Sequence, residues 1–283
     1  MELMYRLRNE SETRPWARKS LGQNFLVHRE TIEAIVRITD IRPGETVIEL
    51  GPGLGAITWG LAACASRVIA VEIDSRLVSW LTKPGRLPEN VEVLHQDMLD
   101  VCFSELADRF GPGLAVVGNL PYNIASRMVF RLVEERAWIS RAILMFQKEV
   151  AERIQGRPGT KDYGILSVMA QSFSDIDRLF DIPPGSFRPV PKVTSTLLRF
   201  RFREPATPVL DLDVFKKVVK AAFSRRRKML ANNLKTLAGI DLEELDEVLG
   251  SCGISGRSRA EELDVHSFIC LANTLALGCL RQK

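Results

Sequence analysis

Four consecutive residues, Asn119, Leu120, Pro121 and Tyr122, carry the groups needed to bind a planar base with an exocyclic amine. The Asn119 side-chain oxygen and the Leu120 carbonyl can both accept hydrogen bonds from one amino group. Pro121 restricts the local backbone, and Tyr122 offers an aromatic face on which a base can stack. The tetrapeptide follows an apolar run at residues 114–117. This placement predicts a ligand site at the carboxyl end of a buried strand, where open α/β sheets bind their ligands.

A glycine-rich segment predicts a second part of this site. Gly51, Gly53 and Gly55 come directly after the β-branched sequence at residues 46–50, and a helical stretch over residues 56–65 follows them. Glycines at such a junction permit a tight turn and a close approach of backbone amides to a ligand. We therefore predict that these three glycines border a bound cofactor.

Two acidic positions extend the cofactor prediction. Glu72 ends an apolar segment about 20 residues after the glycines, which is the reach expected of a carboxylate that binds a ribose diol. Asp97 and Met98 follow the next apolar segment, residues 91–94. Asp97 can accept a hydrogen bond from an adenine amino group, and Met98 can pack against the ring.

The class of cofactor has three alternatives. The spacing of Gly51, Gly53 and Ala56 fits the fingerprint of nicotinamide dehydrogenases. Glu49 argues against that class, because a carboxylate close to the first glycine repels a pyrophosphate and attracts a cation. S-adenosylmethionine carries a sulfonium, an ammonium and a ribose and has no phosphate, so we favour it. A structural Rossmann domain without a cofactor is the third alternative.

The elements that must position these residues alternate between strand and helix. Buried strands are predicted at residues 46–50, 67–71, 91–94, 114–117 and 141–146. Helical stretches between strands in this order are typical of βαβ units, which form parallel sheets. We therefore predict an α/β fold with a Rossmann-like parallel sheet and helices on both of its faces.

Three further segments have weaker signals. Residues 23–26 combine two amides with apolar side chains, and alone they are also compatible with a loop that packs into the core. Residues 187–195 open a strand predicted to alternate through residue 203, and their prolines favour a rigid segment that holds Phe187 out as a stacking platform. A single phenylalanine is more often a core residue. Residues 156–161 form a polar, basic loop, either a mobile lid or an ordinary exposed connection.

The pattern changes from strands to helices near residue 204, where Pro205 and Pro208 indicate a hinge. We predict a flexible tip over residues 1–18, a catalytic domain over residues 19–204 and a small all-α domain over residues 205–283.

The predicted helical domain contains no acid between Lys216 and Lys235, and the cations of this stretch include the run Arg225, Arg226, Arg227 and Lys228. A charge run usually covers a solvated face. This run has a single sign, and the remainder of the domain is roughly neutral, so we predict that these four residues contact the phosphate backbone of a nucleic acid.

Composition limits the classes of protein to which this chain can belong. The 283 residues carry a formal charge of +4 with a pI of about 8.9, which permits a polyanionic partner. The five cysteines are scattered without a Cys-x-x-Cys motif, so we expect reduced thiols and no zinc site, and no other metal cluster is indicated. No apolar run reaches the roughly 18 residues of a membrane span. We expect a soluble, cytoplasmic protein, and nothing requires more than a monomer.

Taken together, these motifs resemble those of the ribosomal RNA adenine dimethyltransferase family, and most closely its small-subunit (16S) branch, the KsgA (RsmA) type. The resemblance covers nearly the whole chain from residue 19 to about residue 280. It rests on a combination of segments: Gln23-Asn24-Phe25-Leu26, Glu49-Leu50-Gly51-Pro52-Gly53-Leu54-Gly55, Val71-Glu72-Ile73-Asp74, Asn119-Leu120-Pro121-Tyr122-Asn123-Ile124-Ala125-Ser126, residues 187–195 and Ala222-Phe223-Ser224-Arg225-Arg226-Arg227-Lys228.

The resemblance implies a class I methyltransferase fold with S-adenosylmethionine as the cofactor. The residues that it places at or beside the cofactor are Gln23, Asn24, Leu26, Gly51, Glu72, Asp97 and Asn119. It further implies that Asn119 and the Leu120 backbone bind the target amine, with Tyr122 and Phe187 stacking on the adenine. The implied product is dimethylated at two adjacent adenosines near the 3′ end of small-subunit ribosomal RNA.

Two alternatives to this function stay open. One is a ribosome-assembly factor that binds RNA and in which catalysis is secondary. The other is a large-subunit ribosomal RNA methyltransferase of the macrolide-resistance type, although those relatives usually carry Ile where Leu120 stands here.

Overall fold

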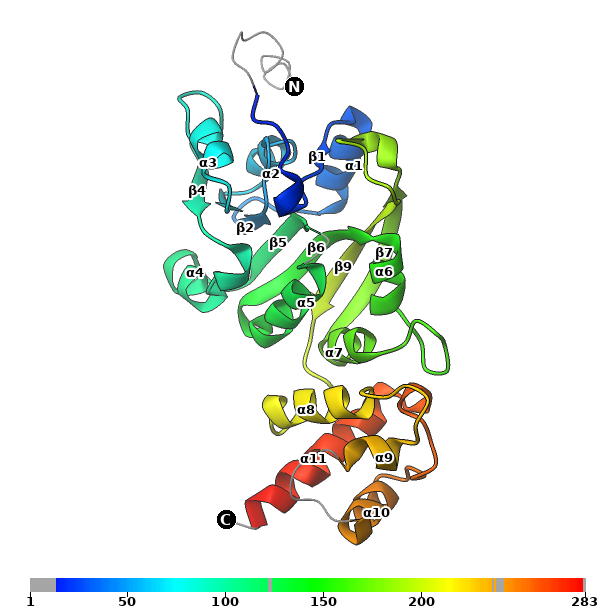
Figure 1. The fold of residues 1–283 in the computed structure, drawn as a ribbon. Coiled ribbons are helices and arrows are strands. Elements are labelled where there is room, and N and C mark those ends of the chain that lie inside the picture. Colours follow the sequence, from blue (N-terminus) through cyan, green and yellow to red (C-terminus); the bar gives the residue numbers. More distant parts are fainter. Residues whose placement is uncertain (1–13, 122–123, 236, 238–241, 282–283) are drawn as a thin grey trace. The chain divides into compact units, whose positions relative to one another are not determined.

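The computed structural model describes residues 14–121, 124–235, 237 and 242–281 (Figure 1). The chain divides into two compact units. The first extends to Lys148 and includes Asp177–Arg201, and the second comprises Glu149–Ile176 and Phe202–Lys283. The predicted boundary near residue 204 therefore lies close to one observed boundary. The sequence did not predict that residues 149–176 belong with the C-terminal helices.

A seven-stranded sheet forms the centre of the fold, with the strand order β4-β3-β2-β5-β6-β9-β7. The strands are β2 (Thr46–Leu50), β3 (Arg67–Glu72), β4 (Val91–His95), β5 (Leu114–Asn119), β6 (Ile139–Gln147), β7 (Ser174–Ile182) and β9 (Ser195–Phe202). Strands β4, β3, β2, β5 and β6 run parallel to one another, and β9 is antiparallel to β6. The predicted α/β fold with a mostly parallel sheet is confirmed.

The position of β2 in the sheet decides where a ligand can bind. It pairs with β3 on one side and with β5 on the other, so the chain reverses its direction of winding at β2. A crevice forms outside the carboxyl ends of the strands at such a switch point. Every residue of β2 is buried, as is usual for a strand with parallel neighbours on both sides.

Helices connect these strands, and Figure 1 shows α5 in front of the sheet. In the first unit they are α1 (Arg29–Ile38), α2 (Thr58–Cys64), α3 (Ser75–Leu81), α4 (Phe103–Phe110) and α5 (Ala125–Glu134). Helix α6 (Lys148–Ile154) begins at the boundary between the units. A core of buried residues that includes Ile35, Val47 and Leu61 packs between α1, α2 and the sheet.

The segment predicted as one strand from residue 187 is two strands. Strand β8 (Phe187–Arg188) pairs with β1 (Phe25–Leu26) in a separate two-stranded sheet, and β9 joins the main sheet. The pairing aligns Phe187 with Leu26 and buries the Phe187 ring, which is 1% exposed. The prediction that the prolines hold Phe187 out as a platform is therefore wrong. Strand β7 was not predicted from the sequence.

The second unit is helical. Besides most of α6, its helices are α7 (Ile165–Phe173), α8 (Leu212–Ala222), α9 (Leu230–Leu234), α10 (Leu242–Ser251) and α11 (Val265–Arg281). Aromatic rings join its segments: Phe173 meets Phe215 at 5.8 Å between ring centroids, and Phe223 stacks on Phe268 at 5.6 Å. Because Phe173 belongs to α7, these contacts give one reason why residues 149–176 group with the C-terminal helices.

The helical unit also contains a disulfide between Cys252 and Cys270, whose Cα atoms are 5.9 Å apart. The expectation of reduced thiols is wrong for this pair. The two cysteines are separated by 18 positions in the sequence, and they meet only because the chain after α10 packs beside α11. Cys64 and Cys102 are free thiols.

Candidate active site

A pocket opens at the carboxyl ends of β2, β3 and β5. Its lining comprises residues 21–26, 51–54 and 119–121 together with Ala56, Ile57, Glu72, Ile73, Leu77 and Met98. Three neighbouring strand ends and the segment before β1 thus contribute to one site. Among these lining residues, Glu72 is the one charged side chain.

The turn after β2 has a left-handed backbone at three positions, which favours glycine, and two of these glycines, Gly51 and Gly53, line the pocket. The φ angles of Gly51, Gly53 and Gly55 are 72°, 59° and 83°. A Cβ on Gly53 would also lie 3.1 Å from Cδ1 of Phe25, which is tighter than ordinary van der Waals contact. Gly55 is absent from the pocket lining among the described residues, and its N–H donates to the Pro52 carbonyl at 2.8 Å to close the turn.

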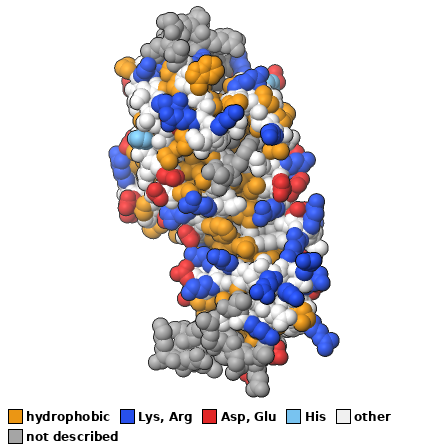
Figure 2. All heavy atoms as spheres, viewed as in Figure 1, with side chains coloured by type: hydrophobic (Ala, Val, Ile, Leu, Met, Phe, Trp, Pro, Cys, Tyr) orange, Lys and Arg blue, Asp and Glu red, His pale blue; other side chains and the backbone are white. Residues whose placement is uncertain are grey.

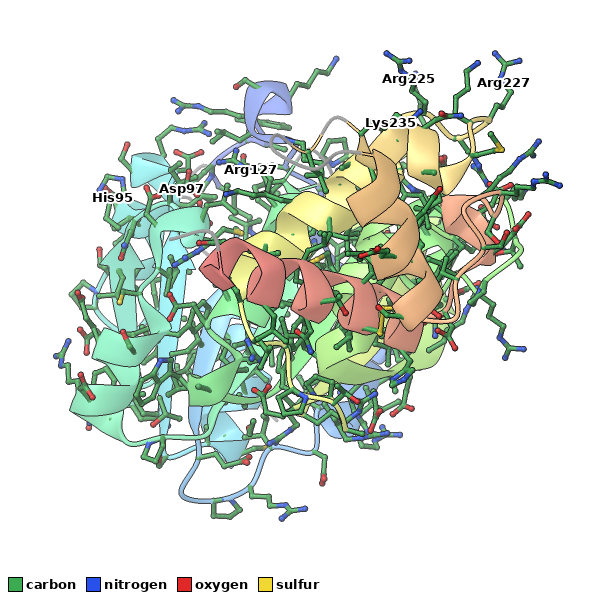
Figure 3. The ribbon with its side chains drawn as sticks, turned by 90° about the horizontal axis from the view of Figure 1, so that it is seen from below. His95, Asp97, Arg127, Arg225, Arg227 and Lys235 are labelled. Atoms are coloured by element: carbon green, nitrogen blue, oxygen red, sulfur yellow. A yellow bond between two sulfur atoms is a disulfide. The ribbon has the colours of Figure 1, made fainter. Side chains whose placement is uncertain are left out.

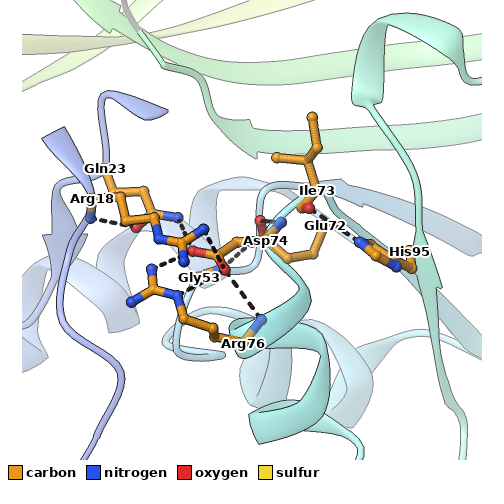
Figure 4. Close-up of polar contacts among 8 residues, drawn as sticks. All are labelled: Arg18, Gln23, Gly53, Glu72, Ile73, Asp74, Arg76 and His95. Carbon is orange, nitrogen blue, oxygen red and sulfur yellow. Dashed lines mark hydrogen bonds and ion pairs between the residues drawn. The ribbon is translucent and has the colours of Figure 1, made fainter. Parts of the chain in front are cut away.

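Glu72 lies at the end of β3 with its carboxylate held by two backbone N–H groups (Figure 4). Oε1 accepts from Asp74 N at 2.9 Å, and Oε2 accepts from Gly53 N at 3.3 Å. Burial raises the pKa of Glu72, and these hydrogen bonds partly offset the rise. Each carboxylate oxygen has two lone pairs, so both oxygens can still accept from a ligand diol.

Glu49 lies in the middle of β2 and is fully buried. Neither of its carboxylate oxygens has a hydrogen-bond partner within the described part of the chain. Burial raises its pKa to about 7, the Thr58 hydroxyl opposes the rise, and the Glu72 carboxylate adds to it. Glu49 does not line the pocket, so a role toward the cofactor would have to act from beneath the glycine turn.

Asp97 and Met98 follow β4, and the structure separates their roles. Met98 lines the pocket, and its Cε would be 3.3 Å from a Cβ at Gly51. Asp97 is outside the lining, and its Oδ1 accepts from Leu99 N at 2.9 Å at the start of a short 3₁₀ helix, Met98–Asp100. Figure 3 shows Asp97 beside His95 at this edge of the first unit.

Asn119 ends β5 and contacts the segment that precedes β1. Its Nδ2 donates to the Asn24 carbonyl at 3.1 Å. Only the amide nitrogen can donate to a carbonyl, so this bond fixes the orientation of the side chain. The Asn119 Oδ1 has no hydrogen-bond partner among the residues that the structure describes, which leaves it available to a ligand.

Known proteins share this architecture. The family described as Ribosomal RNA adenine dimethylase matches residues 15–277. The chain belongs to this family. A "Ribosomal RNA small subunit methyltransferase A" from Geobacter metallireducens is 45% identical over 266 residues, which cover 93% of this chain and 97% of that protein. A protein of the same name from Xanthomonas oryzae is 42% identical over 266 residues, covering 94% and 98%.

Two solved structures extend the similarity to the fold. A dimethyladenosine transferase from Plasmodium falciparum has a TM-score of 0.75 at 26% identity, covering 87% of this chain and 95% of that one. The 23S rRNA methyltransferase ErmE has a TM-score of 0.63 at 29% identity, covering 89% and 100%. This adenine dimethylase is therefore an enzyme of the S-adenosylmethionine-dependent class, and the dehydrogenase alternative is overturned.

The pocket fits S-adenosylmethionine. The lining has no lysine or arginine that would neutralise a pyrophosphate, whereas Glu72 presents a carboxylate suited to a ribose diol. The buried Glu49 lies two residues before the glycine turn, and its oxygens have no partner among the described residues, so a cationic ligand nearby would favour its charged form. Residues 21–26, 51–54, Glu72 and Met98 would hold the cofactor.

Three of the four residues predicted to bind the target base, Asn119, Leu120 and Pro121, belong to the described part of the chain. The Leu120 side chain is 1% exposed, which anchors its backbone, and the Pro121 carbonyl accepts from Ile124 N at 3.1 Å. Tyr122 lies outside the described residues. Phe187 is buried in the core cluster with Leu26, so the ring has no exposed face on which a base could stack.

In the helical unit, Arg226 differs from the other three residues of its predicted RNA-binding cluster. Its Nε pairs with Glu261 at 2.8 Å, and its Nη2 donates to the Thr160 carbonyl at 3.3 Å. The Glu261 carbonyl accepts from Gly159 N at 2.7 Å. Arg226 therefore ties the loop at residues 156–161 to the rest of the unit, and that loop is held rather than free.

Three loops of this unit consequently lie side by side. Leu230 N donates to the Ser258 carbonyl at 2.7 Å, which brings the turn near residue 257 to the arginine cluster. The exposed cations on the three loops are Arg157, Lys161, Arg225, Arg226, Arg227, Lys228, Arg257 and Arg259. Figure 2 shows Lys and Arg side chains on the surface of this unit, and Figure 3 shows Arg225 and Arg227 pointing away from the ribbon.

Sequence reasoning missed two groups. The basic loop at residues 156–161 was recognised but not connected with the arginine run, and the cations at residues 257 and 259 stand apart from that run in the sequence. Asp74 was quoted only as part of a motif, although an acid directly before a helical pattern is a signal for an N-cap. The part of the chain that the structure describes contains no group of three His, Cys, Asp or Glu side chains placed to hold a metal, and no helix suited to span a membrane.

Proposed function

We propose that this chain dimethylates the exocyclic amines of two adjacent adenosines near the 3′ end of 16S ribosomal RNA. The observation that carries the proposal is the Asn119 side chain in the pocket lining, whose Nδ2 donates to the Asn24 carbonyl while its Oδ1 has no partner among the described residues. The curated relatives that are 39–45% identical are named for the small subunit, whereas the similarity to the 23S enzyme ErmE is 29%.

The residues of the chain act on the amine rather than on a proton. The nitrogen lone pair of adenine is delocalised into the ring, so the free amine is a poor nucleophile. Hydrogen bonds from its two N–H groups to Asn119 Oδ1 and the Leu120 carbonyl favour a pyramidal nitrogen with a localised lone pair. When bound, S-adenosylmethionine supplies an electrophilic methyl group on its sulfonium. No strong base is needed, because the methylated nitrogen is acidic enough to release its proton to water.

The pocket must also serve a base that has left its stack. An adenine inside paired RNA is out of reach, so the enzyme binds it extruded and replaces the lost stacking contacts. We assign this role to Tyr122. The Pro121 carbonyl accepts a hydrogen bond from Ile124 N, and the proline ring restricts the backbone directly before Tyr122 in the sequence.

The three basic loops of the helical unit would bind the RNA backbone. Phosphates are neutralised by exposed lysines and arginines regardless of sequence, so such a surface supplies affinity while the pocket supplies selectivity. Arg225, Arg227 and Lys228 would contact phosphate directly. The proposal includes a monomeric enzyme that acts in the cytoplasm on the assembling small subunit.

One alternative has an observation in its favour. The basic loops belong to a different compact unit from the pocket, so binding and catalysis are separable in the structure. A ribosome-assembly factor with secondary catalysis would use the loops and leave the pocket dispensable.

The test is transfer of labelled methyl from S-adenosylmethionine to small ribosomal subunits purified from cells that lack the modification. Fully modified small subunits and large subunits are the controls. We expect label in the unmodified small subunits alone, recovered as dimethyladenosine. Label on large-subunit RNA would indicate the resistance-type function, and absence of transfer to any RNA would favour the assembly factor.

A further inference from the structure

The carboxylate of Asp74 is buried at the start of α3, and both of its oxygens are engaged (Figure 4). Oδ1 accepts from Arg76 N at 3.1 Å and from Arg76 Nε at 3.0 Å, and Oδ2 accepts from Arg76 Nη2 at 2.5 Å. The Arg18 Nη1 lies 3.8 Å from Oδ1. Hydrogen bonds from Arg76 lower the pKa of Asp74 to about 2, so the group is a carboxylate at neutral pH.

Asp74 also makes a contact to Gln23 that a helix cap does not require. An N-cap aspartate needs a single bond to a backbone N–H one turn into the helix, and Arg76 N provides it. Oδ2 also accepts from Gln23 Nε2 at 3.2 Å, from a residue 51 positions earlier. The other end of the same amide, Gln23 Oε1, accepts from Arg18 N at 2.8 Å. Because one amide end accepts and the other donates, Arg18 and Asp74 together fix the direction of the Gln23 side chain.

The fixed glutamine precedes the residue that orients the acceptor site. Gln23 is followed by Asn24, whose carbonyl holds Asn119 Nδ2 at 3.1 Å. A continuous set of contacts therefore runs from the end of β3 to the end of β5 through the segment before β1. We infer that Asp74 is a positioning residue, which holds Gln23 and thereby keeps the Asn24 carbonyl where it orients the Asn119 amide. This inference rests on the proposed role of Asn119 toward the target amine.

An exchange of the amide and the carboxylate tests the contact. In Asp74→Asn, two amides face each other, and the Gln23 amide cannot turn without losing Arg18 N. In Gln23→Glu, two carboxylates face each other, and the helix cap is left in place. The double variant Gln23→Glu/Asp74→Asn restores one donor and one acceptor. We expect each single change to lower kcat by about tenfold and the double variant to recover to within about threefold of the wild type.

A second readout does not depend on turnover. Arg18 and Lys19 are exposed trypsin sites in the segment before β1, which the Gln23 contacts hold in place. In the ligand-free full-length chain, we expect each single variant to be cleaved after these residues about tenfold faster than the wild type, and the double variant to return to the wild-type rate. The matched control is Arg109→Gln, which removes an exposed ion pair with Glu92 elsewhere in the first unit and should resemble the wild type in both assays.

The outcomes separate the inference from the proposed function. Recovery of kcat and of trypsin resistance in the double variant supports the inference. Wild-type kcat and cleavage in Gln23→Glu overturn it, as does a double variant no better than the single ones, and the intact cap in Gln23→Glu keeps this result meaningful even when Asp74→Asn unfolds. A wild-type chain without activity on small-subunit RNA refutes the proposed function, and the cleavage rates still decide the inference.

Discussion

The pocket of the first unit and the basic loops of the second unit use charge in opposite ways. In the pocket, Glu72 is the one charged side chain of the lining. It is buried, as are the neighbouring acids Glu49 and Asp74. On the loops, eight cations are exposed, and among the residues that the structure describes, Arg226 is the one of the eight with an ion pair, to Glu261. Groups with fixed partners can orient a small ligand, whereas long exposed cations attract a polyanion without prescribing its sequence.

Interactions within the buried pocket are screened weakly by salt, and those on the exposed loops are screened strongly. Changes in the pocket should therefore alter turnover at any ionic strength, and changes on the loops should alter affinity for RNA with a marked dependence on salt.

The largest effect is expected from Asn119→Ala. Loss of one acceptor for the target amine should lower kcat by about 10² to 10³, while the dissociation constant for S-adenosylmethionine changes by about threefold or less. Methyl transfer to unmodified small subunits and calorimetric titration of the cofactor measure the two quantities. Asn232→Ala, which removes an exposed amide, is the control. Turnover at the wild-type level in Asn119→Ala would remove this residue from the mechanism.

The opposite pattern is expected from the triple reversal Arg225→Glu/Arg227→Glu/Lys228→Glu. Affinity for small subunits at moderate salt should fall by about a hundredfold, with a shallower salt dependence and unchanged cofactor binding. The control reverses Arg29, Arg37 and Arg42 in the first unit, which changes the net charge by the same amount. Equal losses in the two triple variants would show that net charge, rather than the loop surface, determines binding.

The buried acid Glu49 should give an effect that depends on pH. Its folded-state pKa of about 7 lies above the ordinary value of 4.5, so the ligand-free protein loses stability as the pH rises through this interval. Glu49→Gln removes that loss. The free energy of unfolding of the wild type, relative to the variant, should fall by about 2 kcal/mol between pH 5 and pH 8. Parallel stability curves from urea unfolding at the two pH values would contradict the burial argument.

The smallest effect distinguishes members of the arginine cluster. Arg227→Ala should weaken RNA binding about threefold and reduce the salt slope by about one phosphate contact. Arg226→Ala/Glu261→Gln removes an ion pair with no net charge and should change affinity by less than about twofold at the same salt. Filter binding over a salt series compares the two. A loss as large as that of Arg227→Ala would mean that Arg226 contacts phosphate itself.

Much of the fold was predictable because its signals are local. Strand β2 has the bounds expected from its β-branched residues, and β3, β4, β5 and β6 lie within about three residues of their predicted ends. The glycine turn and the positions of Glu72 and Asn119 follow from the rule that parallel strands present their carboxyl ends at one edge. Strand β7 was missed because its polar and apolar residues do not alternate regularly and most of them are only partly buried.

The sequence by itself thus determined the parallel sheet, the cofactor-binding edge and the acceptor tetrapeptide, since hydrophobic period and turn chemistry are properties of short segments. Only the tertiary structure decided which distant side chains meet. Register turned the Phe187 ring into the core, helix packing joined Cys252 to Cys270, and loop contacts gathered isolated cations around Arg226. The bond from Gln23 to Asp74 belongs to the same class, because side-chain direction across 51 residues is set by packing and leaves no local pattern.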